Sequence, residues 1–212
     1  MAVQSLKARR TLLWMAAAAA MAVAGLSGCD RLGLGSSAKP SFKAVDITGA
    51  EYAQGFDLQD VNGQRRTLAD FKGKVVVVFF GYTQCPDVCP ATMAELAQVK
   101  RGLGEDAARV VGVFVTVDPE RDSPELLKAY LGHFGPDMVG LWGSPDEVRA
   151  TAKSFKVFYS KAPGKTETSY TVDHTAGSYV FDTKGQIRLF TRYGSGAEAL
   201  THDLKLLLAD GR

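Results

Sequence analysis

The sequence has few of the residues that build most metal and disulfide sites: only three cysteines and three histidines occur among its 212 residues. Three cysteines are too few for a disulfide-stapled scaffold, so each one needs its own explanation. The chain also lacks a strong excess of charge of either sign, with 25 basic and 23 acidic residues. A chain this close to neutral lacks the excess of basic residues that binds the phosphates of nucleic acids, so we expect no nucleic-acid partner.

Long hydrophobic runs are missing as well. A membrane-spanning helix needs about 20 apolar residues, whereas the run Leu12–Leu26 has 15. Residues 1–10 carry three basic residues and no acid, and this order is typical of a signal peptide. The run ends in the letters LSGC, which resemble the lipobox of bacterial lipoproteins, where the cysteine, here Cys29, is lipidated and becomes the first mature residue. The alternatives are an ordinary signal peptide with a chance cysteine, or an uncleaved anchor.

The start of the chain therefore has the pattern of an export signal. Arg9 and Arg10 resemble the core of a twin-arginine signal, but ordinary leaders also hold adjacent arginines, so both export routes stay open. Either route places the remaining chain outside the cytoplasm, and Asp30 resembles a signal for retention in the inner membrane. We predict a signal peptide over residues 1–28, a flexible tether over 29–41 and one domain over 42–212. The domain is then lipid-anchored to the cell membrane and faces the periplasm or the cell exterior.

The remaining residues alternate between strand and helix patterns. Lys74–Phe80 and Arg109–Val117 are continuous β-branched runs, typical of strands buried on both faces. The helix pattern Ala91–Leu103 lies between them and predicts a βαβ unit with parallel strands. Further expected elements are helices that begin at Ser123 and Ser144, hairpins of Phe56–Leu58 with Arg65–Leu68 and of Ser178–Phe181 with Gln186–Phe190, and a last helix over Ala197–Leu208. This order predicts an α/β, thioredoxin-like fold: a central mixed sheet flanked by helices, with an extra N-terminal hairpin.

The segment FGYTQCPDVCP, from Phe80 to Pro90, leaves the carboxyl end of a predicted strand and enters a helix, where open α/β sheets place ligands. Pro90 fits only in the first helical turn, so Cys89 lies near the helix start, where unpaired amides and the helix dipole favour thiolates. Residues four apart on a helical turn have Cβ atoms about 5–6 Å apart. One metal ion or a disulfide can therefore join Cys85 and Cys89. Cysteines flanked by proline on such a loop are poor core candidates.

Two further motifs follow, TVDPERD at Thr116–Asp122 and VDHT at Val172–Thr175. Together with CPDVCP they resemble the SCO/SenC family of membrane-anchored, thioredoxin-like copper proteins that help to assemble cytochrome c oxidase. The resemblance runs from about Phe56 to Leu208. It implies one copper ion per chain, Cu(I) or Cu(II), bound by Cys85, Cys89 and His174.

His174 stands where a thioredoxin-like protein has a cis-proline that faces its cysteines, so it should point at the cysteine loop. Two thiolates and an imidazole form a soft, low-coordinate set suited to copper, whereas zinc normally takes a fourth ligand. On spacing alone, a surface histidine is an equal alternative. Asp173 is a candidate to orient the ring, and a turn-stabilising carboxylate is the alternative. We interpret His133 and His202 as exposed or structural, and Asp118–Asp122 as a loop held by local ion pairs.

The implied function is that of a metallochaperone rather than an enzyme. It would accept copper and pass it by ligand exchange to the CuA centre in a cytochrome c oxidase subunit, with a copper donor and a periplasmic thiol reductant as further partners. The alternative is a thiol–disulfide oxidoreductase that keeps the CuA cysteines reduced. The two overlap, since a Cys85–Cys89 disulfide abolishes the metal site until a partner reduces it. A peroxiredoxin-like peroxidase is disfavoured because Thr83 stands two, not three, residues before Cys85.

Overall fold

The structure is a computed structural model that describes residues 41–166 and 169–210. Ser41–Arg212 form one compact unit. The predicted signal peptide, the lipidation site at Cys29 and the tether up to residue 40 lie outside the described residues. Within the described ranges, no helix is both long enough and apolar enough to span a membrane.

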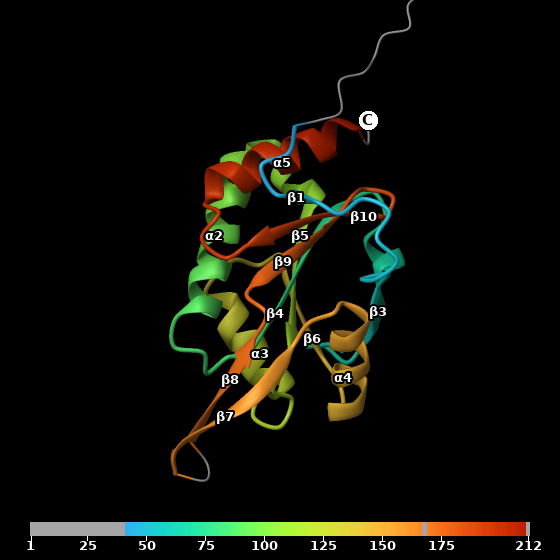
Figure 1. Cartoon of the computed structure of the whole chain (residues 1–212). Coiled ribbons are helices and arrows are strands. Elements are labelled where there is room, and N and C mark those ends of the chain that lie inside the picture. The colour runs from blue at the N-terminus through green and yellow to red at the C-terminus, as the bar shows by residue number, and fades with distance from the viewer. Residues whose placement is uncertain (1–40, 167–168, 211–212) are drawn as a thin grey trace, which may run out of the picture. The chain divides into compact units, whose positions relative to one another are not determined.

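An eight-stranded mixed sheet forms the centre of the fold (Figure 1). Its strands lie in the order β1 (Val45–Asp46), β10 (Ile187–Arg192), β9 (Gly177–Phe181), β4 (Val75–Gly81), β5 (Val110–Thr116), β6 (Met138–Trp142), β2 (Asp57–Asp60) and β3 (Arg65–Thr67). β4 and β5 are buried along their whole length and pair in parallel, with Val75 opposite Val110. β6 continues the parallel set, and β9 pairs with β4 in the antiparallel direction. The predicted βαβ unit and mixed sheet are confirmed.

Helices cover both faces of this sheet. They are α2 (Val88–Leu103), α3 (Pro124–Gly132), α4 (Pro145–Ser154) and α5 (Ala197–Asp210), with 3-10 turns η1 (Leu68–Phe71) and η2 (Gly104–Arg109). Val75 and Val77 pack against α2 and α5 on one face. On the other face the ring of Phe80 lies 5.1 Å from that of Phe155, which follows α4. Because side chains alternate along a strand, β4 contributes to a core on each face of the sheet.

Two predicted helix starts are confirmed by their caps. The Ser123 hydroxyl accepts a hydrogen bond from the Leu126 N–H, and Ser144 forms the predicted capping box with Glu147. The hairpins β9–β10 and β2–β3 are also present. The second pairs with β6 and so extends one edge of the sheet, as the predicted N-terminal hairpin. These starts and turns could be predicted because each depends on residues close together in the chain.

Four strands do not follow from the sequence pattern. They are β1, β6, β7 (Tyr159–Thr166) and β8 (Ser169–His174). β6 is short and contains a glycine, and β7 contains proline and glycine, so both read as loops. β7 and β8 pair with each other in a separate two-stranded sheet that projects beyond the main one (Figure 1). The VDHT motif therefore lies at the end of a strand rather than in a polar loop.

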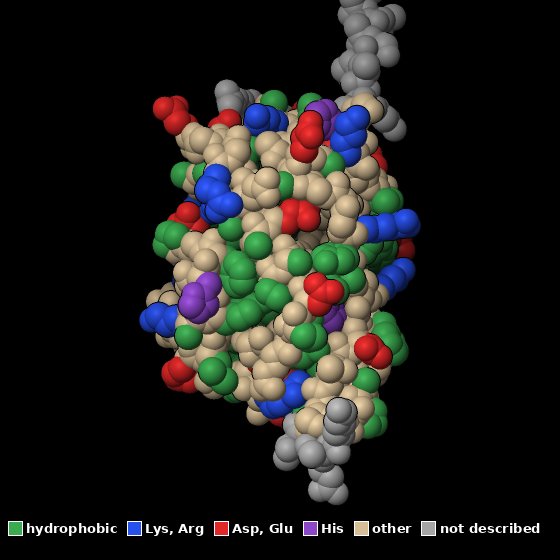
Figure 2. All heavy atoms as spheres, turned by 90° about the vertical axis from the view of Figure 1, so that its left-hand side faces the viewer, with side chains coloured by type: hydrophobic (Ala, Val, Ile, Leu, Met, Phe, Trp, Pro, Cys, Tyr) green, Lys and Arg blue, Asp and Glu red, His purple; other side chains and the backbone are tan. Residues whose placement is uncertain are grey.

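The surface on the α2 side of the molecule has dispersed charge. Figure 2 shows apolar side chains across the middle of this face, with lysine and arginine side chains spread around it rather than gathered in one patch. The basic and acidic groups of the sequence are thus interspersed on this side.

Candidate metal centre

The cysteine loop joins β4 to α2. Gly81 ends the strand and Cys89 is the second residue of the helix, so Pro90 occupies the first helical turn as expected. Gly81 has no room for a side chain, since a Cβ atom would lie 2.9 Å from the Cys89 Sγ and 2.7 Å from the Phe79 ring. This close approach of the strand to the loop fixes the place of Cys89 against the core.

The structure brings the three sequence-predicted residues together. The Cys89 N–H lies 3.5 Å from the Sγ of Cys85, and the Cys89 Sγ lies 3.4 Å from the Nε2 of His174. The three possible ligand atoms all lie within 4.8 Å of one another, and both cysteines are free thiols. Bonds from a metal ion to nitrogen and sulfur are about 2.0–2.3 Å long. One ion can therefore reach all three atoms after small side-chain movements.

The two cysteines differ in their surroundings. Cys85 is half-buried, whereas Cys89 is fully buried and packs in the same core cluster as Met93. The expectation that both motif cysteines avoid the core is therefore wrong for Cys89. Burial raises the pKa of the Cys89 thiol because its thiolate would lose hydration. This desolvation outweighs the stabilisation of a thiolate expected at the helix N-terminus.

His174 is the last residue of β8, and two aromatic side chains hold its ring. The ring centroid lies 5.8 Å from that of Phe79 and 6.1 Å from that of Tyr82, both close to edge-on. The Nδ1–H of His174 donates a hydrogen bond to the carbonyl oxygen of Thr175 at 3.2 Å, which leaves the Nε2 lone pair directed at the cysteines. Burial lowers the pKa of His174. Burial therefore favours the neutral imidazole, the state that binds metals.

The remaining candidates lie outside this cluster. Asp173 is exposed, and the Thr175 carbonyl rather than its carboxylate contacts the Nδ1 of His174. The Asp173 charge raises the pKa of His174, but less than burial lowers it. His133 is exposed after α3, and His202 is exposed on α5, as the sequence predicts.

Sequence reasoning missed a contact between the loop after β5 and the cysteine loop. Asp122 is fully buried and accepts hydrogen bonds from the Thr83 N–H at 3.1 Å and from the hydroxyls of Thr83 and Thr116 at 2.6 Å each. Burial raises the pKa of Asp122, while these hydrogen bonds lower it. The predicted local ion pair is present between Arg121 and Asp118. The acidic TVDPERD motif is the sequence signal, but its partner Thr83 lies 39 residues away.

A surface hollow of about 310 Å³ opens at this site. It is lined by the cysteine loop, including Tyr82 and Cys85, and by β8 residues from Thr171 to His174. Cys89 lies behind these residues in the core. An ion can therefore enter or leave the site from solvent without disruption of the core.

Comparison with known proteins agrees with the motifs. The SCO1/SenC family matches residues 45–209 of this chain. The mitochondrial SCO2 homolog of Mus musculus is 41% identical over 140 residues, which cover 65% of this chain and 54% of the mouse protein. The matched parts span between 54% and 64% of the length of three such curated relatives. Each of these relatives therefore has further residues outside the part that matches this chain.

Solved structures give the same result for the fold. The copper-bound ScoI of Bradyrhizobium japonicum is 42% identical, with a TM-score of 0.67, and the match covers 73% of this chain and 98% of ScoI. A SCO1/SenC family lipoprotein of Bacillus anthracis is 28% identical, with a TM-score of 0.61 and coverage of 72% and 92%. The predicted thioredoxin-like fold is confirmed.

Proposed function

This chain belongs to the SCO1/SenC family, and from that premise we propose that it is an extracytoplasmic copper metallochaperone. It binds one copper ion through Cys85, Cys89 and His174 and delivers it to the CuA centre during assembly of cytochrome c oxidase. The observation that carries this proposal is the site itself, two thiols and one imidazole within 4.8 Å of one another beside a solvent-accessible hollow.

The ligand set suits copper better than other common ions. Soft sulfur ligands select Cu(I), and the imidazole adds a nitrogen that Cu(II) also accepts. Structural zinc takes four protein ligands. Among the described residues, no further histidine, cysteine or carboxylate joins Cys85, Cys89 and His174 in this cluster. A three-ligand site with one open side also leaves room for a partner's ligand, which is what transfer by ligand exchange requires.

A copper-bound relative supports copper as the ion that is carried, and the sequence motifs support cytochrome c oxidase as the protein that receives it. ScoI of Bradyrhizobium japonicum, the 42% identical structure, holds copper. The destination follows from the resemblance of the three motifs to proteins that assemble cytochrome c oxidase. The partners are then the oxidase subunit that carries CuA, a copper donor, and a thiol reductant that keeps Cys85 and Cys89 reduced.

A second candidate function is thiol–disulfide exchange on the CuA cysteines. One observation favours it: Cys85 lines the open hollow, while Cys89 is buried directly beside it. An accessible thiol can attack a partner's disulfide, and the buried thiol can then resolve the mixed disulfide. In the complete exchange, the two thiols of this chain become a disulfide and the partner's disulfide becomes two thiols.

A transfer experiment separates the two functions. The reduced domain of residues 42–212, loaded with one equivalent of Cu(I), is mixed with the reduced, metal-free CuA domain of the same organism, and the two are separated by size. We expect the copper to leave with the CuA domain. In a parallel mixture, metal-free reduced domain meets oxidised CuA domain. Release of CuA thiols there, with no copper transfer in the first mixture, would favour the oxidoreductase.

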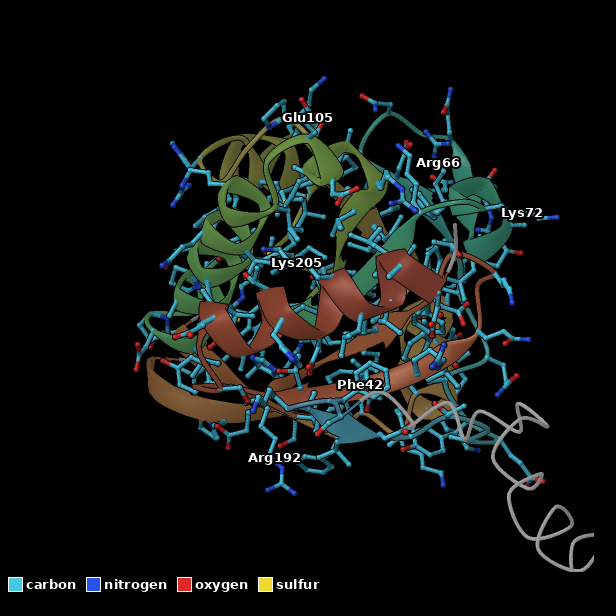
Figure 3. The ribbon with its side chains drawn as sticks, turned by 90° about the horizontal axis from the view of Figure 1, so that it is seen from above. Phe42, Arg66, Lys72, Glu105, Arg192 and Lys205 are labelled. Atoms are coloured by element: carbon cyan, nitrogen blue, oxygen red, sulfur yellow. The ribbon has the colours of Figure 1, made fainter. Side chains whose placement is uncertain are left out.

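We further propose that a lipid on Cys29 holds the domain at the cell membrane, facing the periplasm or the cell exterior. The leader pattern supports this, and the Bacillus anthracis relative is a lipoprotein. The first described residues are fastened to α5, because the buried Asp203 accepts the N–H groups of Lys43 and Ala44 at 2.8 Å each. Phe42 packs beside α5 as well (Figure 3). Within the domain, α5 and the β7–β8 hairpin lie towards opposite ends (Figure 1).

The variant Cys29→Ser tests the anchor. We expect it to lose lipidation because no thiol remains to carry the lipid, and to be found as a soluble protein or an unprocessed precursor. Cell fractionation and metabolic labelling with a radioactive fatty acid measure this. Copper binding by the purified protein should be unchanged, since residue 29 is not part of the metal site. A Cys29→Ser protein that is labelled and membrane-bound like the parent would show that the lipobox is misassigned.

A further inference from the structure

The hairpin that carries His174 is not part of the main sheet. β7 and β8 form a separate two-stranded sheet with no ladder to any other described strand. The position of the hairpin beside the cysteine loop therefore depends on side-chain contacts and on the chain that continues into β9. We propose that Arg121 is a positioning residue of the metal site, which holds this hairpin, and through it the His174 ring, against the cysteine loop. The inference rests on the proposed ligation of copper by His174.

Arg121 connects three segments of the chain. Its guanidinium pairs with Asp118 in the loop after β5. Its Nη1 atom donates a hydrogen bond to the carbonyl oxygen of Tyr170 on β8 at 2.9 Å. The same atom lies 3.3 Å from the side-chain oxygen of Gln84 in the cysteine loop. The guanidinium carbon also lies 3.5 Å from the centroid of the Tyr170 ring. A single side chain thus contacts both the hairpin and the cysteine loop.

These contacts form a closed and largely dry arrangement. The Tyr170 hydroxyl donates to Asp118 at 2.7 Å, so the same carboxylate holds both the arginine and the tyrosine. The Asp118 side chain is 1% exposed and that of Arg121 is 15% exposed. Charge-assisted hydrogen bonds and cation–π contacts are stronger when shielded from water. The Nη2 atom of Arg121 is buried with no hydrogen-bond partner among the described residues, so the ion pair, the stacking and the Nη1 bond to the Tyr170 carbonyl hold the guanidinium.

Two sets of contacts connect Arg121 with the His174 imidazole, one along β8 and one through Tyr82. Tyr170 and His174 lie on the same face of β8, because alternate residues of a strand point the same way, and the intervening Val172 is buried on that face. The Arg121 guanidinium also lies 5.7 Å from the ring of Tyr82, which meets the His174 ring edge-on. Loss of Arg121 should release the hairpin and misalign His174, while Cys89 stays in place because it is buried in the core at the start of α2.

A double-mutant cycle tests this inference in the domain of residues 42–212. Arg121→Met should weaken Cu(II) binding by about 10- to 100-fold, the effect typical of residues that orient a metal ligand. It should also weaken the thiolate-to-Cu(II) charge-transfer band and, in the metal-free protein, speed amide hydrogen exchange in β7 and β8. In a His174→Ala background, the same substitution should change Cu(II) affinity by less than about twofold, because both changes remove the same ligand.

Two further variants keep the test independent of folding. Arg121→Met leaves Asp118 buried without its cation, which by itself destabilises the fold. Tyr170→Leu instead removes the stacked ring and its hydroxyl from the hairpin side. It leaves the Arg121–Asp118 pair and the hydrogen bond to the carbonyl of residue 170 in place, and should show a loss in the same direction. Arg149→Met is the matched control: Arg149 also pairs with an aspartate three residues before it, but on the exposed face of α4. It should leave Cu(II) binding unchanged.

The outcomes distinguish this inference from the proposed function. If His174→Ala weakens Cu(II) binding but Arg121→Met and Tyr170→Leu do not, the positioning role is wrong and the ligand assignment stands. Equal losses from Arg121→Met with and without His174 would also overturn the positioning role, because they would show a general structural effect. If His174→Ala itself leaves Cu(II) binding unchanged, the proposed ligand set is wrong and the inference falls with it.

Discussion

Serine in place of Cys85 or Cys89 should weaken Cu(I) binding to the reduced domain by more than about 100-fold, the upper end of the effect of residues that only orient a ligand. The remaining thiolate and imidazole make a poor Cu(I) site, because Cu(I) selects soft sulfur ligands and a serine hydroxyl is a hard one. Competition with a coloured Cu(I) chelator measures the dissociation constant of each variant. The double variant should bind no stoichiometric copper.

The two positions need different controls because their burial differs. Cys89 is fully buried, and a serine hydroxyl left there without a partner costs about 1–3 kcal/mol of folding free energy. Cys89→Ala avoids that cost and should lose copper to the same degree. Cys85 is half-buried, so Cys85→Ser should leave thermal unfolding nearly unchanged. Stoichiometric Cu(I) binding by a folded double variant would show that the metal site is elsewhere.

His174→Ala separates the chaperone from the oxidoreductase. Thiol exchange needs only the two cysteines, so the Cys85–Cys89 couple should still cycle between thiol and disulfide. Copper binding needs the imidazole, above all for Cu(II), which prefers nitrogen ligands. We therefore expect weaker copper binding and loss of the thiolate-to-Cu(II) charge-transfer band. Cells with this variant should lose cytochrome c oxidase activity to the same extent as cells that lack both cysteines, with partial rescue by added copper.

The matched control for this experiment is His133→Ala, since His133 is exposed after α3 and outside the cluster. It should bind copper and support the oxidase as the parent does. Full oxidase activity with His174→Ala, together with none in either cysteine variant, would mean that the thiols alone carry the function. The oxidoreductase would then be the better assignment.

The parts of the fold that could be predicted are those encoded locally. The continuous β-branched runs around Val75–Gly81 and Val110–Thr116 are typical of strands buried on both faces. Ser144 and Glu147 specify their own capping box within four residues. Pro90 restricts Cys89 to the first turn of α2. The motif order then placed the cysteines and His174 in one family pattern, and the structure brings their side chains together.

What could not be predicted depends on contacts between distant segments. The hairpin β7–β8 has a loop-like composition, with proline and glycine in its first strand, and it exists as strands only because the two halves pair. The TVDPERD motif reads as a self-contained loop, yet Asp122 holds Thr83 and Arg121 holds Tyr170, which lie 39 residues before and 49 residues after them. The burial of Cys89 likewise depends on the packing of the strand beneath it, and the neighbouring prolines do not reveal it.

The most direct test of the central claim is a titration of the reduced domain, residues 42–212, with Cu(I), followed by X-ray absorption spectroscopy of the loaded protein. The account predicts saturation at one copper per chain, with two sulfur ligands and one nitrogen ligand around the ion. It also predicts that the nitrogen disappears in His174→Ala and that the sulfurs disappear in the double serine variant. Absence of binding at one equivalent, or an unchanged ligand set in those variants, would contradict it.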